Sequence, residues 1–193
     1  IVYQVGRTGA VTPVANLEAV QLGGTTVKKA TLHNADQISR LGLTPGDYVY
    51  VERGGEVIPK IVGVDESMRV VGDDLFSAAP DSFPTNCLEC GAALVREEGE
   101  AAHYCPNAES CPPQVSGRIV HFISLESMNI NGLGAETVLR LVEAGLLVDP
   151  GSLYDLKAED ILPLERMAEI SVKKLLNGIE VSKEIPFERV LFG

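Results

Sequence analysis

The 193-residue chain has no tryptophan, and no apolar run approaches the roughly 20 residues needed to cross a bilayer, so no membrane contact is predicted. It also lacks an initiator methionine and a basic amino-terminal region, and both ends are apolar. We therefore expect a piece of a longer protein rather than a secreted one. Basic residues are scarce, with 16 Lys and Arg against 27 Asp and Glu, a net charge of -11. This balance argues against nucleic-acid binding that depends on net charge alone.

The rest of the composition is that of a globular protein, with 45% hydrophobic and 22% charged residues. The acidic excess is uneven along the chain. Residues 1–72 contain 7 basic and 7 acidic residues, whereas residues 73–116 contain one basic and 8 acidic residues. The neutral first segment can therefore still present one face to phosphates.

All four cysteines fall into two pairs, Cys87-x2-Cys90 and Cys105-x5-Cys111, with 14 residues between the pairs. Two close pairs joined by a hairpin-length insert suit one tetrahedral Zn²⁺ held by four thiolates. Two disulfides are the alternative, but nothing else in the sequence suggests secretion. Four thiolates leave no open coordination position, so we expect a structural zinc that stabilises a segment too small for its own core.

The residues beside the cysteines agree with this interpretation. Gly91 follows Cys90 and allows the left-handed turn of a metal-binding knuckle. Pro112 and Pro113 follow Cys111 and are expected to fix a loop rather than a helix.

The insert between the pairs predicts a short hairpin formed by residues 93–96 and 101–104. His103 and His121 are possible ligands, but four thiolates already complete a structural site. We therefore expect His103 to lie on the hairpin surface.

Residues 1–72 predict a small β-barrel with one helix, because short segments rich in Val, Ile and Thr alternate with Gly or Pro turns. Asn34 is placed to cap the helix, and Gly42 would end it. Many short strands around one helix favour a Greek-key barrel of the OB type, with an SH3-like barrel as the alternative. The expected strands are Ile1–Val5, Ala10–Val14, Glu18–Leu22, Thr25–Ala30, Tyr48–Glu52 and Val57–Val64.

Residues 73–86 are interpreted as a linker, followed by a zinc finger over residues 87–112. Residues 113–193 show apolar residues at helical spacing and predict an all-α segment, so the chain as a whole is expected to be multidomain α+β. Gly132 and Gly134 flank one apolar residue between two expected helices, the pattern of a helix-hairpin-helix. Backbone N–H groups there can hold a DNA phosphate without a basic side chain. A structural αα-turn is the alternative.

Together these motifs resemble the carboxy-terminal half of the bacterial NAD-dependent DNA ligases, over essentially the whole chain. The resemblance is specific because several motifs occur in the family's order, although the family usually has Asp in place of Glu56. The matching runs are Val5–Gly9, Thr12–Ala15, Ala30–Asn34, Gly46–Asp47, Gly55–Lys60, the four cysteines with their prolines, Gly132–Gly134, Leu153–Leu156 and Ser182–Glu184.

The resemblance implies an enzyme that seals nicks between a 3′-hydroxyl and a 5′-phosphate in duplex DNA, in replication and repair. That family uses NAD and Mg²⁺ and forms enzyme-AMP and DNA-adenylate intermediates. This chain contains no Lys-x-Asp-Gly adenylation motif, so we expect the DNA-binding, nick-clamping portion of such a ligase, inactive alone and truncated within the helix-hairpin-helix region. The implied partners are nicked duplex DNA and the remaining ligase domains, in a monomer of the bacterial cytoplasm, associated with the nucleoid.

By the same resemblance, Arg7, Thr8, Val57 and Ile58 would enter the minor groove beside the nick, and Gly132 with Gly134 would contact phosphate. No catalytic residue is expected in this chain. Without the resemblance, Arg7 and Thr8 would be interpreted as a solvated turn. Val57 and Ile58 would be interpreted as barrel core, with at most one of them directed inward unless the strand bends, because adjacent strand residues point to opposite faces.

Other polar residues carry weaker expectations. Lys28, Lys29 and Lys60 are candidate phosphate contacts, and His33 is expected to hydrogen-bond inside the barrel. A non-catalytic nucleic-acid-binding module built from an OB barrel and a zinc ribbon, and a protein-interaction fragment, remain as alternative functions.

A second hairpin is expected between residues 164 and 171, where this chain departs from the family pattern. Ala168 is expected at a position where glycine would permit positive φ, and Glu169 would bring a carboxylate towards phosphate. We therefore expect Gly132 and Gly134 to form the turn that binds the DNA phosphate. The second turn is expected to bind phosphate weakly or to be purely structural.

Overall fold

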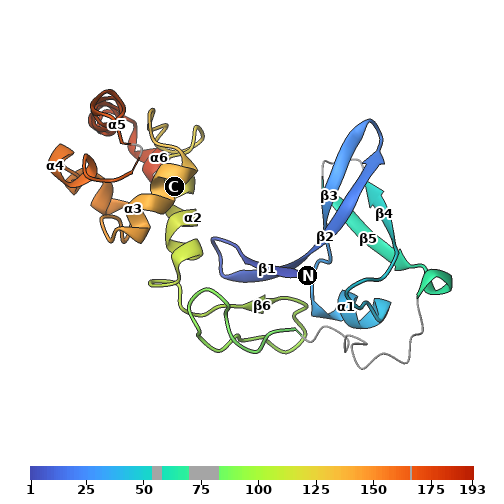
Figure 1. Ribbon diagram of the computed structural model, residues 1–193. Coiled ribbons are helices and arrows are strands. Elements are labelled where there is room, and N and C mark those ends of the chain that lie inside the picture. The colour runs from blue at the N-terminus through green and yellow to red at the C-terminus, as the bar shows by residue number, and fades with distance from the viewer. Residues whose placement is uncertain (54–57, 70–82, 166) are drawn as a thin grey trace. The chain divides into compact units, whose positions relative to one another are not determined.

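The computed structural model describes residues 1–53, 58–69, 83–165 and 167–193 (Figure 1). The chain divides into two compact units, Ile1–Pro106 and Asn107–Gly193. Among the described residues, no helix is both long enough and apolar enough to cross a bilayer.

The first unit is built on a mixed sheet with the strand order β1-β2-β3-β5-β4. Strand β5 pairs with β3 in parallel, where Thr31 faces Lys60, and with β4 in antiparallel fashion. This crossover distinguishes the sheet from a simple meander and agrees with the expected OB-type Greek key. The strands are β1 (Val2–Val5), β2 (Ala10–Leu22), β3 (Thr25–Thr31), β4 (Val49–Arg53), β5 (Pro59–Val64) and β6 (His103–Tyr104).

Strand β2 differs from the prediction, which divided it into two strands. The pairing of β2 with β3 shifts register between Asn16 and Val20, and the chain continues through this irregularity as one long strand. A β-bulge absorbs the break in alternation that a sequence pattern interprets as a turn. Strand β5 begins at Pro59, and Val57, the expected start of that strand, lies outside the described residues.

Helix α1 (Ala35–Leu41) has the predicted caps. The Asn34 side chain accepts a hydrogen bond from the backbone N–H of Gln37 at 3.0 Å, and Gly42 ends the helix with φ 55°. The buried side of α1 packs into the barrel, because Ile38 joins a core with the fully buried Leu32 and Ile61. A 3₁₀ turn, η1 (Glu66–Met68), follows β5.

The second unit is helical, as the apolar periodicity predicts. Its buried core includes Val115 and Ile119 from the first helix, Val138 and Leu141 from the next, and Leu175 near the carboxyl end. The elements are α2 (Pro112–Phe122), α3 (Ala135–Glu143), η2 (Gly151–Asp155), α4 (Ala158–Ile161), α5 (Glu169–Ser182) and α6 (Phe187–Phe192).

The expectation that Pro112 and Pro113 form a loop is wrong, because both lie in the first turn of α2. Proline is tolerated there, since the N–H groups of the first turn have no partner within the helix and the fixed φ suits helical geometry. Cys111 is the residue that caps this helix.

Candidate metal centre and nucleic-acid interface

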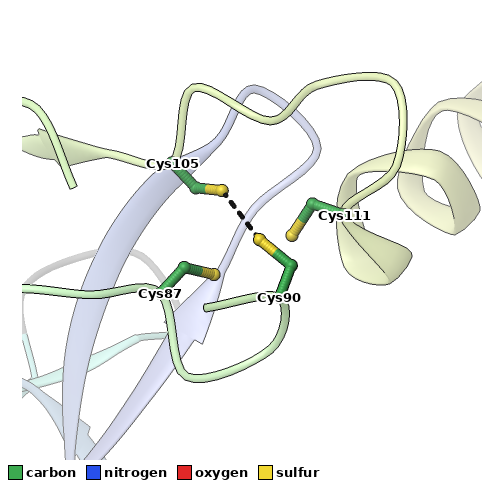
Figure 2. A group of neighbouring side chains, drawn as sticks. All are labelled: Cys87, Cys90, Cys105 and Cys111. Carbon is green, nitrogen blue, oxygen red and sulfur yellow. Dashed lines mark hydrogen bonds between the residues drawn. The ribbon is translucent and has the colours of Figure 1, made fainter. Parts of the chain in front are cut away.

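The four cysteine side chains converge (Figure 2). Their Sγ atoms all lie within 4.8 Å of one another, and those of Cys90 and Cys105 are 3.5 Å apart. Four Zn–S bonds of about 2.3 Å in a tetrahedron place the sulfurs about 3.8 Å apart, so the cluster fits one such ion. A disulfide requires about 2.05 Å between sulfurs, which excludes that bond between Cys90 and Cys105.

Backbone hydrogen bonds shape the first cysteine pair into a tight knuckle. The N–H of Gly91 donates to the carbonyl oxygen of Cys87, and the N–H of Cys87 donates to that of Ala92, both at 2.8 Å. Gly91 has φ 75°, the left-handed conformation predicted for this residue. The knuckle therefore presents the thiols of Cys87 and Cys90 on its inner side.

The second cysteine pair comes from a strand end and a helix start. Cys105 directly follows β6, whereas the fully buried Cys111 directly precedes α2. The amino-terminal end of a helix carries partial positive charge, which favours the thiolate form that binds a metal ion.

The hairpin between the cysteine pairs is present, since Val95 and Tyr104 exchange both backbone hydrogen bonds at 2.9 and 2.8 Å. His103, expected on its surface, is half-buried and stacks on the ring of Phe83 with centroids 4.3 Å apart. Burial lowers the pKa of His103, and the charge of Arg96 acts in the same direction. The surface prediction was wrong because the stacking partner lies 20 residues away in sequence.

Arg7 and Thr8 lie on the tight turn between β1 and β2, and both are exposed. The turn is closed by hydrogen bonds from the N–H of Gly6 to the carbonyl oxygen of Ala10 and from the N–H of Gly9 to that of Gly6, both 2.9 Å. The side chains therefore project from a constrained backbone and are accessible to a ligand.

Ile58 is 68% exposed, so barrel core is the wrong interpretation for this residue. An exposed β-branched side chain beside the start of β5 is available to press on another surface. Val57, expected to act with it, lies outside the described residues.

Gly132 and Gly134 lead into α3 and are both exposed. Gly132 has φ 87°, and Gly134 caps α3 with φ -109° and no side-chain hydrogen bond at the cap. The first turn of α3 thus presents backbone N–H groups with no side chain at the cap residue, and its one carboxylate, Glu136, forms an ion pair with Arg140. Such a turn suits an anion.

Family comparison adds direct evidence. Residues 1–73 match the model of the NAD-dependent DNA ligase OB-fold domain, and residues 86–112 match that of the NAD-dependent DNA ligase C4 zinc finger domain. The chain thus carries two domains of the NAD-dependent DNA ligases. Proteins named DNA ligase from Christiangramia forsetii, Phocaeicola vulgatus and Cytophaga hutchinsonii are 60%, 59% and 52% identical to it over 99–100% of its length. The chain spans 28% of the length of each of these relatives.

The two domain matches decide between the alternatives left open for the barrel and for the cysteines. The barrel is an OB fold, so the SH3-like barrel is excluded. The thiol cluster lies in a C4 zinc finger, so the zinc interpretation replaces that of two disulfides.

The turn before α5 corrects the expectation for the second hairpin. Ala168 caps α5 with φ -80° and ψ 150°, an extended conformation that any residue adopts. Its counterpart in the first hairpin is the cap residue Gly134, and the position matching Gly132 is Arg166, which lies outside the described residues. Ala168 therefore carries no backbone strain.

The remaining basic candidates and His33 lie at the barrel surface. Lys28 and Lys29 are exposed on β3, whereas the ammonium of Lys60 lies 3.3 Å from the carboxylate of Glu52. His33 was expected inside the barrel, but its side chain is exposed and its φ is 59°. Histidine is among the residues that adopt this left-handed conformation more often than most.

Sequence patterns missed one residue that shapes the first hairpin. Gly178, within α5, is buried, and a Cβ built on it would lie 2.0 Å from the carbonyl oxygen of Asn131. The backbone just before Gly132 thus packs directly on α5. Its position three residues after Leu175, on the apolar face of the helix, is the signal that could have identified it.

Proposed function

We propose that this chain is the DNA-binding, nick-clamping portion of an NAD-dependent DNA ligase, which seals 3′-hydroxyl/5′-phosphate nicks through enzyme-AMP and DNA-adenylate intermediates. The observation that carries the proposal is the presence of both ligase-specific domains in one chain, with the Arg7–Thr8 turn exposed. NAD and Mg²⁺ would serve the parent enzyme, a monomer of the cytoplasm. The remaining ligase domains would supply the adenylated lysine.

In this proposal, Cys87, Cys90, Cys105 and Cys111 hold one structural Zn²⁺. Support comes from the donor set, because four thiols within 4.8 Å suit a closed tetrahedral site. The ion would fix the fold of the finger, and this chain's contribution to sealing would come from its DNA contacts.

The OB barrel would contact the nicked duplex through its exposed turn and the residues before β5. The Arg7 guanidinium and the Thr8 hydroxyl can donate hydrogen bonds to sugar and base edges in the minor groove. Ile58, and Val57 beside it in sequence, would press on the groove floor and favour a deformed duplex.

The helical unit would add a sequence-independent contact as a helix-hairpin-helix. Gly132, Gly134 and the first turn of α3 would bind a phosphate through backbone N–H groups, which reconciles DNA binding with a net charge of -11. The turn before α5 would bind phosphate more weakly, because Glu169 is the first residue of that helix, whereas the first-turn Glu136 of α3 forms an ion pair with Arg140.

Kinetics of the full-length parent ligase test the proposal. In single-turnover assays, Arg7→Ala is expected to slow nick sealing by about ten- to a hundredfold, since a lost groove contact costs roughly 1–3 kcal/mol. Lysine adenylation by NAD, measured separately without DNA, should be unchanged. Arg40→Ala is the matched control, because Arg40 is an exposed arginine on the same barrel, in α1. Equal loss in both steps, or an equal effect of the two variants, would contradict the assigned role.

The isolated chain gives a second test. Incubation with labelled NAD and Mg²⁺ should leave no label on the protein, because the chain contains no adenylation motif. A covalently labelled 20.6 kDa band would refute the proposal that the remaining ligase domains supply the adenylated lysine.

A further inference from the structure

We propose that the zinc-finger hairpin positions the Arg7–Thr8 turn, so that metal occupancy of the finger controls the order of a DNA-contacting element in the barrel. The inference rests on the proposed function for the role of Arg7. The coupling itself rests on contacts within the first unit.

The turn depends on a neighbour for its conformation. Arg7 and Thr8 are exposed, whereas Gly9 beside them is buried with φ 85°. A residue of a two-strand turn is buried only when another segment covers it. Gly9 is therefore the point at which an external contact reaches the turn.

That contact comes from a cysteine of the metal centre. The backbone N–H of Cys105 donates to the carbonyl oxygen of Gly9 at 2.9 Å. Just before it in sequence, β6 pairs with the start of β2, with Tyr104 opposite Ala10 and His103 opposite Val11. The residue whose thiol is placed to bind zinc thus holds, through its own backbone, the residue that follows Thr8.

Two further contacts attach the finger to the barrel. The guanidinium of Arg96 makes a bidentate ion pair with Asp36 of α1, at 2.9 and 2.6 Å. The ring of Phe83 lies between His103, at 4.3 Å, and Tyr3 of β1, at 5.0 Å and nearly perpendicular. The finger therefore contacts the barrel at a strand, a helix and an aromatic cluster.

The finger has little apolar core of its own, so without metal little would hold its residues in the positions that make these contacts. Its buried residues include the ligands Cys87 and Cys105, whereas Leu88 and Val95 are 67% and 47% exposed. A segment of this kind folds on its metal and loses its structure when the metal is removed. Loss of β6 and of the Cys105 N–H would then leave Gly9 uncovered and the turn free to sample other conformations.

Hydrogen–deuterium exchange of the 193-residue chain, with zinc and after chelation under reducing conditions, tests the coupling directly. Peptides that cover residues 6–11 should exchange at least about tenfold faster without metal. A peptide over residues 22–26, at the other end of β2, should be unaffected. Equal exchange at residues 6–11 in a chain shown by elemental analysis to be metal-free would overturn the inference.

A variant that spares the metal ligands separates docking from folding of the finger. Arg96→Gln should retain one equivalent of zinc yet exchange faster at residues 6–11, because it removes the ion pair with Asp36. Arg140→Gln is the control, since Arg140 makes a comparable ion pair with Glu136 in α3. Retained zinc with unchanged exchange in Arg96→Gln would also contradict the coupling.

The parent ligase connects the turn to DNA. Arg96→Gln should weaken binding to nicked duplex, and the double variant with Arg7→Ala should bind no worse than Arg7→Ala alone. If Arg7→Ala has no effect on DNA while exchange still depends on zinc, the proposed function fails and the coupling stands. If Arg7→Ala impairs sealing but hydrogen–deuterium exchange at residues 6–11 does not depend on zinc, the proposed function stands and the coupling fails.

Discussion

The close approach of Asn131 to Gly178 makes Gly178→Ala a sharp test of the helical unit. The added Cβ would lie 2.0 Å from the Asn131 carbonyl oxygen and 3.1 Å from its carbonyl carbon, and both are backbone atoms. Such atoms cannot rotate away as the end of a side chain does, so α5 and the segment before Gly132 must separate.

Two opposing effects set the magnitude. Forcing an extra methyl group into a packed site costs typically about 1–3 kcal/mol, and a backbone clash favours the upper end. Replacing glycine by alanine inside a helix returns about 1 kcal/mol of helix propensity. The expected net loss is about 2 kcal/mol in the free energy of unfolding of the helical unit.

Urea denaturation followed by circular dichroism at 222 nm measures this loss, because most helices lie in residues 107–193. With a urea m-value of about 1–3 kcal/mol per molar, a loss of about 2 kcal/mol should lower the midpoint by about 0.7–2 M. Asn177→Ala is the matched control, since Asn177 is the exposed neighbour in the same helix and should be neutral or slightly stabilising. A Gly178→Ala midpoint equal to or above that of the original chain would refute the packing argument.

Three further outcomes are expected. Purified chain should contain about one zinc, and replacing any one cysteine by alanine should unfold the finger first; less than about half an equivalent by elemental analysis would exclude the site. The ion pair with Arg69 lowers the pKa of Asp47 to about 2, so its stabilisation is present above about pH 4 and is lost as the pH falls towards 2. Asp47→Asn should therefore lower the free energy of unfolding of the barrel by roughly 1–2 kcal/mol at pH 7, a figure reduced from the full pKa shift because Arg69 is partly exposed to solvent. Urea denaturation followed by tyrosine fluorescence measures this, and the difference between variant and original chain should be smaller at about pH 2–3. In the parent ligase, Glu169→Lys should strengthen nicked-DNA binding by up to about tenfold, whereas Ala168→Gly should leave it unchanged and Gly132→Val should weaken it. If Glu169→Lys instead abolishes binding and Gly132→Val has no effect, the second hairpin rather than the first binds the phosphate.

Local signals in the sequence were sufficient for several features of the fold. The caps of α1 at Asn34 and Gly42 form as predicted, because capping depends on residues within one turn of the helix end. The thiol cluster also follows from spacing, since each pair is close in the chain and the insert folds back as a hairpin. The DNA contacts assigned to Arg7, Thr8 and the hairpin glycines stay predictions.

Features that depend on distant residues were missed. The burial of His103 requires Phe83, which nothing near His103 in the sequence indicates. The place of Gly178 on the apolar face of α5 indicates that it is buried, but not that it packs on the backbone of Asn131. Ala168 was assigned a positive φ because the hairpin was aligned by residue type; in the structure the equivalent residue is the helix cap, where extended φ suffices. The omissions at His103 and Gly178 arose where one segment packs on another, because a pattern along one segment does not show which residues pack against it.

The pairing of β6 with β2 has a consequence for behaviour in solution. At Ala10 and Val11, this two-residue strand covers the edge of β2 that β3 covers further along the strand. A strand edge with unpaired N–H and carbonyl groups is a template for pairing with another chain. When the metal is lost and β6 detaches, copies of the protein gain an open edge through which they can associate. Zinc depletion is therefore expected to promote self-association and aggregation. In the zinc-bound protein, the finger would prevent this by covering the strand edge through which two barrels could pair.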